Sequence, residues 1–511
     1  MMATTFDDLM ASIDKAGKDV QRDRGNMFED VVKSYLTNEP TYKREFDQVW
    51  LLREVPAEYK IPKKDLGVDL VARNRNTGEL TAVQAKYYKG KVGKETINSY
   101  MAELNKNYYA NGLLVATTDE WNRNAAATLE DTTKEVSRIG LSNLRHAAFD
   151  WSKFSFGDAG QAIQASNKQP RDYQKTAIAK TLDYFQDHER GKLIMAPGTG
   201  KTFTSLKIAE AMAKKSGQDD FKVLYLVPSI QLLSQTLFAW NTDVSPAVDL
   251  ISFAITSDRN ASKKRTFSND DEGDLNISDI GLPATTDVHK LMKNYRQLRE
   301  CDGNRITVIF STYQSIDVIH QAQQQGFPKF DLIIADEAHR TVGSHASQDE
   351  AGMFTKVHSN GVVKASHRLY QTATPKLYSE AVKKQAKEDK IVVSSMDDVS
   401  IYGDEIYRLG FGEAVSSGIL TDYKVEVLAV DQSVIQKDMQ KSIADENGLG
   451  IGDIGKIIGV WNAMMRRESF SNKVSGAPMK RAIAFSSVIN NQRGKNSAHK
   501  VGSMQIADKF N

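Results

Sequence analysis

The stretch Ala196-Pro-Gly-Thr-Gly-Lys-Thr202 decides the fold of the central part of this 511-residue chain. It follows the apolar run Lys192–Met195, which has the character of a buried strand, and it precedes the helical pattern Phe203–Lys214. Glycines in such a turn let backbone N–H groups converge on phosphates, while the lysine and threonine serve the terminal phosphates and Mg²⁺. The residues predicted to bind ATP are therefore Gly198, Thr199, Gly200, Lys201 and Thr202. Met195 stands where the full pattern has its first glycine.

A second motif, Asp336-Glu337-Ala338-His339, follows directly after the apolar run Leu332–Ala335. A carboxylate at the carboxyl end of a strand can hold Mg²⁺, a role that we assign to Asp336 together with Thr202. Its neighbour Glu337 can orient and activate the attacking water. The two motifs together predict an ATPase site.

Short, continuous apolar runs separated by helical stretches continue from Gln169 onward. Strands buried on both faces have this pattern, so we expect an α/β lobe with a parallel, helix-covered sheet. The expected strands are Lys192–Met195, Val223–Val227, Leu250–Phe253, Thr307–Phe310, Leu332–Ala335 and Leu369–Gln371. The polar insertion Asp258–Gly281 is expected to be a surface loop.

These motifs, with others between Gln169 and Tyr423, resemble the superfamily 2 helicases and translocases. Gln169-Pro-Arg-Asp-Tyr-Gln174 is similar to the adenine-recognition motif, which implies ATP-binding roles for Arg171 and Gln174. Thr372, Ala373 and Thr374 match the motif that couples hydrolysis to strand movement. The resemblance further implies DNA contacts at Ser229, Gln231, Ser311 and Thr312. The alternative is a nucleotide-binding protein of another superfamily.

The same family pattern requires a second RecA-like lobe, of which only Arg481–Ser487 resembles the first strand. The chain ends 24 residues later, and it contains no Gln-x-x-Gly-Arg-x-x-Arg segment. Arginine fingers contribute roughly 10³–10⁵ in rate. We therefore expect an N-terminal piece of a longer protein that binds ATP and hydrolyses it poorly, and vigorous DNA-stimulated ATPase activity would contradict this.

The first 150 residues carry a different constellation of polar residues. Glu29 lies on the expected helix Met27–Leu36, Asp69 lies in the strand Val68–Ala72, and Gln84 and Lys86 end the strand Leu80–Lys86. Gln84 and Lys86 share one face of their strand because alternate residues point the same way. Oxygen ligands at Asp69, with help from Glu29 and Gln84, suit Mg²⁺, and Lys86 could position or help to deprotonate the attacking water. The other expected elements are the strands Phe46–Leu52 and Leu113–Thr117 and the helices Thr96–Tyr109 and Trp121–Arg138.

This constellation resembles the PD-(D/E)xK nucleases of the Mrr-like branch, where Gln replaces the last acid. The run Lys60–Lys94, with nine bases against three acids, flanks it and is weak evidence for a phosphate-binding surface. Since an amide is a poorer Mg²⁺ ligand than a carboxylate, a degenerate domain that only binds DNA stays open as the alternative.

Composition sets limits on these readings. A net charge of +2 excludes a globally basic nucleic-acid coat. One cysteine, Cys301, excludes disulfide frameworks and multi-cysteine metal sites and fits a reducing cytosol. No signal peptide or membrane span is visible, so a cytoplasmic location is expected. Gly450–Gly455 is read as a loop, and Asn-Pro-Pro-Tyr-type methyltransferase motifs are absent.

A nuclease placed before a superfamily 2 motor resembles the single-polypeptide Type ISP restriction–modification enzymes. The resemblance implies a Mg²⁺-dependent endodeoxyribonuclease and DNA-dependent ATPase that translocates along double-stranded DNA, with methyltransferase and target-recognition domains after this chain. The alternatives are an ATP-dependent DNA motor or switch whose first domain does not cut, and an RNA helicase. The expected organisation is a nuclease (1–154), a linker (155–168), a first RecA-like lobe (169–390), a connecting helical segment (391–480) and the start of a second lobe (481–511).

Overall fold

A computed structural model describes residues 5–16, 21–64, 67–88, 90–122, 125, 128–129, 132–148, 150–156, 168–256, 277–301, 303–343, 350–379 and 394–423. Most of the expected linker and most of the polar insertion lie outside these residues, as do Gly450–Gly455 and the expected start of a second lobe. Met1–Arg265 and Gly273–Leu420 belong to one compact unit.

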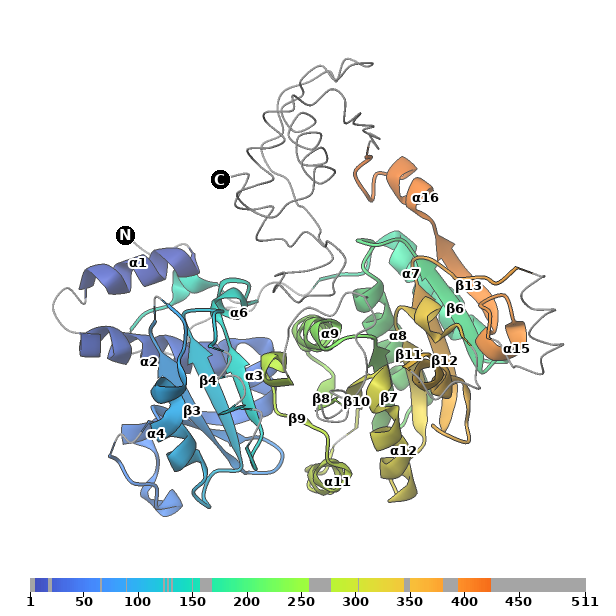
Figure 1. Cartoon of the computed structure of the whole chain (residues 1–511). Helices are drawn as coiled ribbons and strands as arrows, with labels where there is room; N and C mark the ends of the chain where they lie inside the picture. Colours follow the sequence, from blue (N-terminus) through green and yellow to red (C-terminus); the bar gives the residue numbers. More distant parts are fainter. Residues whose placement is uncertain are drawn as a thin grey trace, which may run out of the picture. The chain divides into compact units, whose positions relative to one another are not determined.

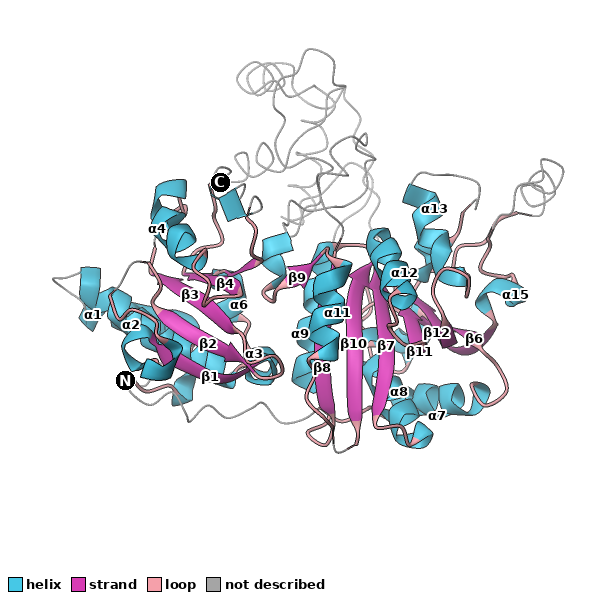
Figure 2. Cartoon of the chain, turned by 90° about the horizontal axis from the view of Figure 1, so that it is seen from below, coloured by secondary structure: helices cyan, strands magenta, loops and turns pink. Residues whose placement is uncertain are grey.

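The first domain, drawn in blue to cyan in Figure 1, is built on a five-stranded sheet in the order β1-β2-β3-β4-β5, of which β1 to β4 are labelled in Figure 2. Its strands are β1 (Phe46–Leu51), β2 (Leu70–Asn74), β3 (Leu80–Lys86), β4 (Asn111–Ala116) and β5 (Val136–Ile139). The pairs β1–β2 and β2–β3 are antiparallel, and the pairs β3–β4 and β4–β5 are parallel. The central strands are apolar and buried, as strands covered on both faces must be.

Helices cover the two faces of this sheet. One face is covered by α1 (Phe6–Ala16) and α2 (Gln21–Asn38). The side chains of Phe28, Val31 and Val32 on α2 share a hydrophobic core with Val83 of β3. On the other face, α4 (Lys94–Leu104) packs with Ile97. The short helices α3 (Pro40–Glu45) and α6 (Leu141–Arg145) and the 3₁₀ turns η1 (Leu52–Glu54), η2 (Ala57–Tyr59) and η3 (Trp151–Lys153) complete the described part of the domain.

The second domain is a RecA-like lobe on a parallel sheet, which in the described residues has the order β13-β6-β12-β11-β7-β10-β8-β9 (Figure 2). Its strands are β6 (Arg190–Met195), β7 (Asp220–Val227), β8 (Asp249–Ile255), β9 (Ala284–Thr285), β10 (Arg305–Thr312), β11 (Phe330–Ala335), β12 (Ala365–Thr372) and β13 (Asp404–Leu409). Strands β6, β12 and β11 are neighbours, so the segments that follow their carboxyl ends meet at one edge of the sheet. This order places the three predicted ATPase motifs side by side.

Helices also cover both faces of the second sheet. Residues of α8 (Lys201–Ser216) and α9 (Ile230–Asp243) share one core with β7 and β10, while α11 (Val288–Arg296) and α12 (Ile316–Gln324) pack on the other face. The remaining elements are α7 (Asp172–Tyr184), α13 (Glu350–Thr355), α15 (Val399–Tyr402), α16 (Phe411–Ser416), η4 (Ile277–Ile280), η5 (Tyr313–Ser315), η6 (Ala338–Thr341) and η7 (Lys356–His358).

Most of the expected strands are confirmed, and three expectations are wrong. The first RecA-like lobe does not end at residue 390, because β13 pairs with β6 inside the segment that was expected to connect the two lobes. The helix expected over Trp121–Arg138 does not extend to its end, because Val136–Ile139 forms β5 with all four residues buried. The polar insertion does not end as an exposed loop: Ile280 is fully buried, and Tyr42 of the first domain donates to the Gly281 carbonyl at 2.8 Å. Strands β9 and β13 and helix α1 were not anticipated.

None of the helices in the described part of the chain has the length and apolar character that crossing a membrane requires.

Candidate nuclease and ATPase sites

The loop between β6 and α8 has the backbone geometry that a phosphate-binding turn requires. Gly198 has φ +79° and Gly200 has φ +82°, a left-handed conformation that L side chains rarely adopt. A Cβ atom on Gly200 would also lie 2.8 Å from Nε2 of Gln174. Lys201 is the first residue of α8, so its ammonium and the N-terminal dipole of the helix share one location. The loop is therefore shaped to surround an anion.

The start of α7 holds this loop in place. Tyr173 Oη donates to the Thr199 carbonyl at 2.9 Å, and Gln174 Nε2 lies 3.4 Å from the same oxygen. The other end of the Gln174 amide accepts from the Arg171 backbone N–H at 3.0 Å. The buried side chain of Gln174 thus connects the start of α7 to the phosphate loop. Its reading of an adenine edge, and a nucleotide contact from Arg171, stay predictions.

Asp336 lies at the carboxyl end of β11 in a buried polar cluster. Tyr225 Oη lies 3.5 Å from its Oδ2, Gln371 Nε2 donates to Tyr225 Oη at 2.5 Å, and Thr202 is a further neighbour of that hydroxyl. Burial, followed by the nearby charge of Glu337, raises the pKa of Asp336 to about 6. A cation would relieve this cost, so Asp336 and Thr202, predicted to share Mg²⁺, are indeed brought together.

Glu337 is linked to the predicted coupling motif through a histidine. Nδ1 of His339 lies 3.3 Å from Glu337 Oε2 and 2.9 Å from Thr372 Oγ1, and that hydroxyl accepts from the Thr374 N–H at 3.2 Å. Burial lowers the pKa of His339, so the ring is neutral at pH 7. The contacts provide a physical route by which a change at the hydrolytic carboxylate can reach Thr372–Thr374.

The four residues predicted to contact DNA divide into two groups. Gln231 is exposed, and Ser229 caps α9 by accepting from the Leu232 N–H at 3.3 Å. Ser311 and Thr312, however, are 0% and 4% exposed, and their hydroxyls contact the Thr312 carbonyl and Ser315. The predicted DNA contacts of Ser311 and Thr312 are therefore corrected: these side chains are part of the interior of the lobe.

In the first domain, Asp69 lies directly before β2 and beside β3. Its Oδ2 accepts from the Ala85 N–H at 2.8 Å, and its own N–H donates to the Val83 carbonyl at 2.9 Å. Since Leu70 pairs with Val83, Asp69 stands opposite Gln84, and the two side chains share a face of the sheet. Gly67, two residues before Asp69, has φ +110°, and a Cβ there would lie 2.7 Å from the Tyr100 backbone N.

Gln84 is fully buried, and neither its Oε1 nor its Nε2 has a hydrogen-bond partner in the described part of the chain. An unsatisfied buried polar group costs about 1–3 kcal/mol, so a ligand or water belongs beside it. Lys86 is half-buried on the same face of the strand, two residues further on. Asp69, Gln84 and Lys86 thus form the group that the sequence predicts.

Glu29 reaches this region from a different direction. It lies on α2, which packs on the face of the sheet that includes Val83, and the adjacent Phe28 contacts the Tyr87 ring with centroids 6.0 Å apart. The ring contact places this part of α2 near the end of β3, but on the face that Val83 lines, opposite the side chains of Gln84 and Lys86. The role of Glu29 as a ligand stays a prediction. Within the described residues, no group of three His, Cys, Asp or Glu side chains is arranged to hold a metal. A metal here would depend on the Gln84 amide.

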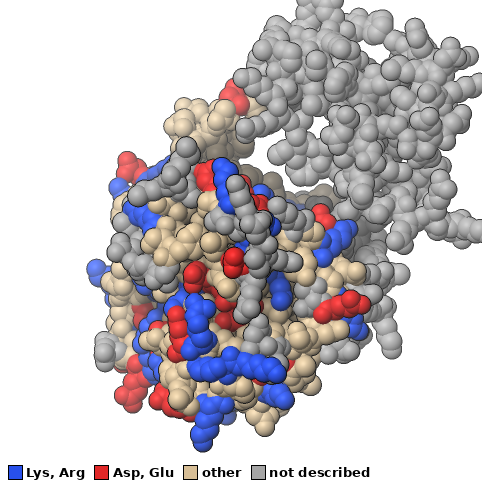
Figure 3. Space-filling view, turned by 90° about the vertical axis from the view of Figure 1, so that its left-hand side faces the viewer, with Lys and Arg blue, Asp and Glu red and all other residues tan. Residues whose placement is uncertain are grey.

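The basic run Lys60–Lys94 does not form one continuous surface. Arg73 pairs with Asp47 at 2.8 Å, Lys91 lies 3.8 Å from Glu120, and Arg75 donates to the carbonyls of Lys43, Arg44 and Phe46. Figure 3 shows acidic and basic side chains intermixed on this side of the molecule. The run therefore serves internal contacts more than a single phosphate-binding face.

Comparisons with known proteins agree with both halves of this description. A family model described as "Restriction endonuclease", of the Mrr catalytic type, matches residues 37–161, and one described as "Type III restriction enzyme, res subunit" matches residues 167–377. A solved structure titled "ATP-dependent Type ISP restriction-modification enzyme LlaBIII bound to DNA" is 51% identical, covers 94% of this chain and has a TM-score of 0.80.

Two curated relatives match more distantly. The "Type I restriction enzyme EcoAI endonuclease subunit" of Escherichia coli is 27% identical over 56% of this chain and 28% of its own length. A "Probable helicase A859L" of African swine fever virus is 27% identical over 56% of this chain and 26% of its own length.

The chain spans 30% of the length of the LlaBIII chain and about a quarter of the length of the two curated relatives. The chain is therefore a fusion of a restriction-endonuclease domain with a RecA-like helicase lobe, and over 94% of its length it is similar to a Type ISP restriction–modification enzyme.

Proposed function

We propose that this chain is the nuclease and motor part of an ATP-dependent restriction endonuclease. It would cleave phosphodiesters of double-stranded DNA with Mg²⁺ after ATP-driven translocation, in the bacterial cytoplasm. The observation that carries the proposal is the presence of two separate sites in one compact unit, a phosphate loop with its Asp336–Glu337 pair and the Asp69–Gln84–Lys86 group. A methyltransferase and a target-recognition domain in the full-length protein are part of the proposal, by similarity to Type ISP enzymes.

The residues of the first domain fit a divalent metal. Asp69 and Gln84 present a carboxylate and an unsatisfied amide on one face, and oxygen ligands of this kind suit Mg²⁺. When bound, the metal supplies an activated water and offsets charge on the scissile phosphate. Lys86 would orient that water, accept or donate its proton, or steady the negative phosphate. Gly67 fixes the backbone that presents Asp69.

The residues of the second domain fit MgATP. Lys201 and the turn of Gly198 and Gly200 would bind the phosphates, and Asp336 with Thr202 would hold the cation. Glu337 would orient and deprotonate the attacking water. His339 would carry the resulting change to Thr372 and from there to Thr374, which is exposed on the lobe.

The test is nicking of supercoiled plasmid by the 511-residue chain with Mg²⁺ or Mn²⁺. We expect Asp69→Asn to lower the rate by more than about 100-fold, since losing even an outer-shell partner of a metal costs 10–100-fold. The matched control is Asp119→Asn, an exposed acid of the same domain that accepts from Ser142. Equal nicking by both variants and the wild type would remove Asp69 from the site. No metal-dependent nicking at all, with DNA binding retained, would favour the alternative of a DNA motor whose first domain does not cut.

A further inference from the structure

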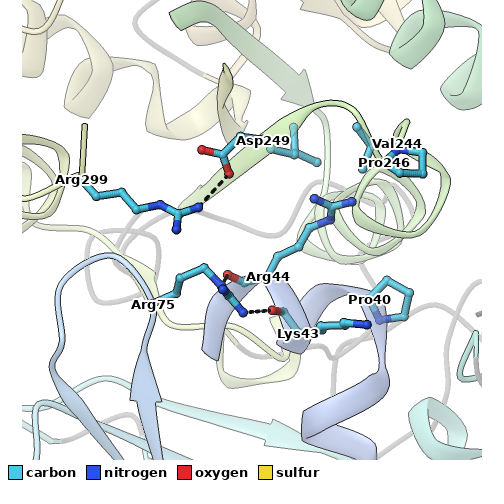
Figure 4. A pocket seen from close by; sticks show the side chains of 9 residues that line it. Pro40, Lys43, Arg44, Arg75, Val244, Pro246, Asp249 and Arg299 are labelled. Atoms are coloured by element: carbon cyan, nitrogen blue, oxygen red, sulfur yellow. Dashed lines mark hydrogen bonds and ion pairs between the residues drawn. The ribbon is translucent and has the colours of Figure 1, made fainter. Parts of the chain in front are cut away.

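A cavity of about 280 Å³ lies where the nuclease domain meets the motor lobe (Figure 4). The nuclease side contributes Lys43 and Arg44 from α3 and Arg75 from the turn after β2, and the motor side contributes Asp249 at the start of β8 and Arg299 after α11. Figure 4 shows Arg44 and Arg299 extending toward the same space from the two domains. This volume is near the lower end of the range for small-ligand sites, roughly 300–1,000 Å³.

The charges around the cavity do not balance. One carboxylate, Asp249, faces it, and that group is already shared between Arg299 at 3.4 Å and Arg305 at 2.9 Å. Glu210, the other acid that acts on Arg44, is paired with Lys207 at 3.0 Å. Lys43, Arg44 and Arg75 therefore add positive charge for which the described residues of the lining offer no further carboxylate.

Arg44 is partly buried and held by weak hydrogen bonds. Burial, more than any other cause, lowers its pKa, and the neighbouring Arg75 lowers it further. Its hydrogen bonds are long: Nε lies 3.4 Å from the Asn241 carbonyl, and Nη1 lies 3.5 Å from the Val248 carbonyl. A desolvated guanidinium with weak partners is costly unless an anion joins it. Arg75 has a different role, since it donates to the carbonyls of Lys43 and Arg44 and so fixes the end of α3.

We propose that this cavity binds a phosphate group between Arg44 and Arg299, with Lys43 as a further cation. Guanidinium forks match the tetrahedral oxygens of phosphate in pairs, and lysine adds a point charge. An occupant would contact both domains at once and so fix the nuclease on the lobe that carries the ATP site. The source of the phosphate is either a DNA backbone or a free phosphate compound. The inference depends on the proposed function only for the first source.

The first experiment measures binding of the 511-residue chain to a short duplex by fluorescence anisotropy at several KCl concentrations. For each phosphate contact that is lost, the slope of log affinity against log salt falls by about 0.9. We expect the double variant Lys43→Gln/Arg299→Gln to lower the slope by about 1 to 2. The control is Lys175→Gln/Arg408→Gln, which removes two cations of similar exposure from the motor lobe.

The second experiment measures how far inorganic pyrophosphate raises the melting temperature without DNA. Because the phosphate loop is intact in the cavity variant and in its control, a difference between the two variants reports on the cavity. A lower salt slope identifies the DNA backbone as the occupant. An unchanged slope with loss of pyrophosphate stabilisation only in the cavity variant identifies a free phosphate. If neither measurement separates the cavity variant from its control, the proposal is overturned.

Two controls test whether the cavity variant is correctly folded. Its melting temperature without ligand should equal that of the wild type, and the charge-preserving variant Lys43→Arg/Arg299→Lys should bind as the wild type does. These readouts do not use DNA cleavage. Failure of the nuclease proposal would therefore leave them unaffected.

Discussion

A buried glutamine lies in each of the two candidate sites, and the two differ in what surrounds them. Gln371 and Gln84 are both 0% exposed. Gln371 donates through Nε2 to Tyr225 and so belongs to the cluster around Asp336, although its Oε1 is unsatisfied. Among the residues that the structure describes, Gln84 has no partner for either amide atom. The ATPase site is thus held together by contacts within the chain, whereas the amide of Gln84 can still accept a ligand.

This difference indicates that the structure of the nuclease site depends more on a bound metal than the structure of the ATPase site does. The motor lobe can keep Asp336, Thr202 and Glu337 in place through hydroxyl and histidine contacts before a nucleotide arrives. The nuclease site has an unmet hydrogen-bonding requirement of about 1–3 kcal/mol at Gln84. We therefore expect metal to stabilise the nuclease domain even without DNA.

The largest expected effects are on catalysis, and they should separate the two sites. Lys86→Met should lower metal-dependent nicking by about 10²–10⁴-fold, the usual contribution of a general acid or base, and leave ATP turnover unchanged. Glu337→Gln should lower ATP turnover by a similar factor and leave metal-dependent nicking unchanged. Plasmid nicking and phosphate release measure the two activities. The control is Lys94→Met, an exposed lysine of the same basic run; loss of nicking there would show a general charge effect.

The two glutamines should respond oppositely to the same substitution. Gln371→Leu removes the donor to Tyr225 and should lower the free energy of unfolding by about 1–3 kcal/mol. Gln84→Leu removes an unsatisfied amide and should leave stability equal or higher in EDTA. Wild type should gain stability from Mn²⁺, and Gln84→Leu should not. Scanning fluorimetry measures both, and a large loss for Gln84→Leu in EDTA would show that its amide is satisfied.

The ATPase site was the easier of the two to find from sequence. The phosphate loop and the Asp336–Glu337 pair are local patterns, each attached to an apolar strand, and the parallel sheet brings them together. Tyr225 and Gln371 were missed because they lie inside apolar strands and gain their roles only through the strand order β12-β11-β7. A polar residue at the end of the run Leu369–Gln371 was the available signal.

The errors have similar physical causes. Ser311 and Thr312 belong to a motif whose position was recognised, but sequence does not show that β10 is central and fully buried. The end of the polar insertion was assigned by composition, which cannot reveal that Ile280 and Gly281 pack against the first domain. In the nuclease domain, the pairing of Asp69 with Gln84 depends on strand register across a hairpin, so spacing alone was weak evidence.

A smaller effect concerns pH at the ATPase site. The pKa of Asp336 is raised to about 6 by burial, so the carboxyl is protonated below that pH and cannot hold a cation. MgATP affinity should fall up to about tenfold for each pH unit below 6, because a metal ligand must be deprotonated. Isothermal titration from pH 5 to pH 8 measures this. The Asp336→Asn variant should show weak, pH-independent binding, and a wild-type affinity constant across the range would contradict the assignment.

The smallest expected effect is on the melting temperature, and it concerns Glu39, a buried carboxyl that is not a predicted metal ligand. Burial raises the pKa of Glu39 to about 7, and its Oε2 accepts from the Thr41 N–H at 2.8 Å. The cost of the charged form is complete above about pH 7, falls as the pH drops from 7 toward 4.5, the ordinary pKa of a glutamate, and is absent below that value. Glu39→Gln should therefore raise the melting temperature by about 1–2 °C at pH 8.5 and by nothing below about pH 4. Mn²⁺ should change neither value; a Mn²⁺ effect specific to this variant would place metal beside α3.

The central claim, that one chain carries two separate metal-dependent sites of unequal readiness, is tested most directly by counting bound Mn²⁺ with electron paramagnetic resonance. Without nucleotide, we predict a site that Asp69→Asn abolishes and Asp336→Asn leaves intact. ATP should add a further site that shows the opposite dependence on the two variants. Unchanged Mn²⁺ binding by Asp69→Asn in the absence of nucleotide would contradict the account.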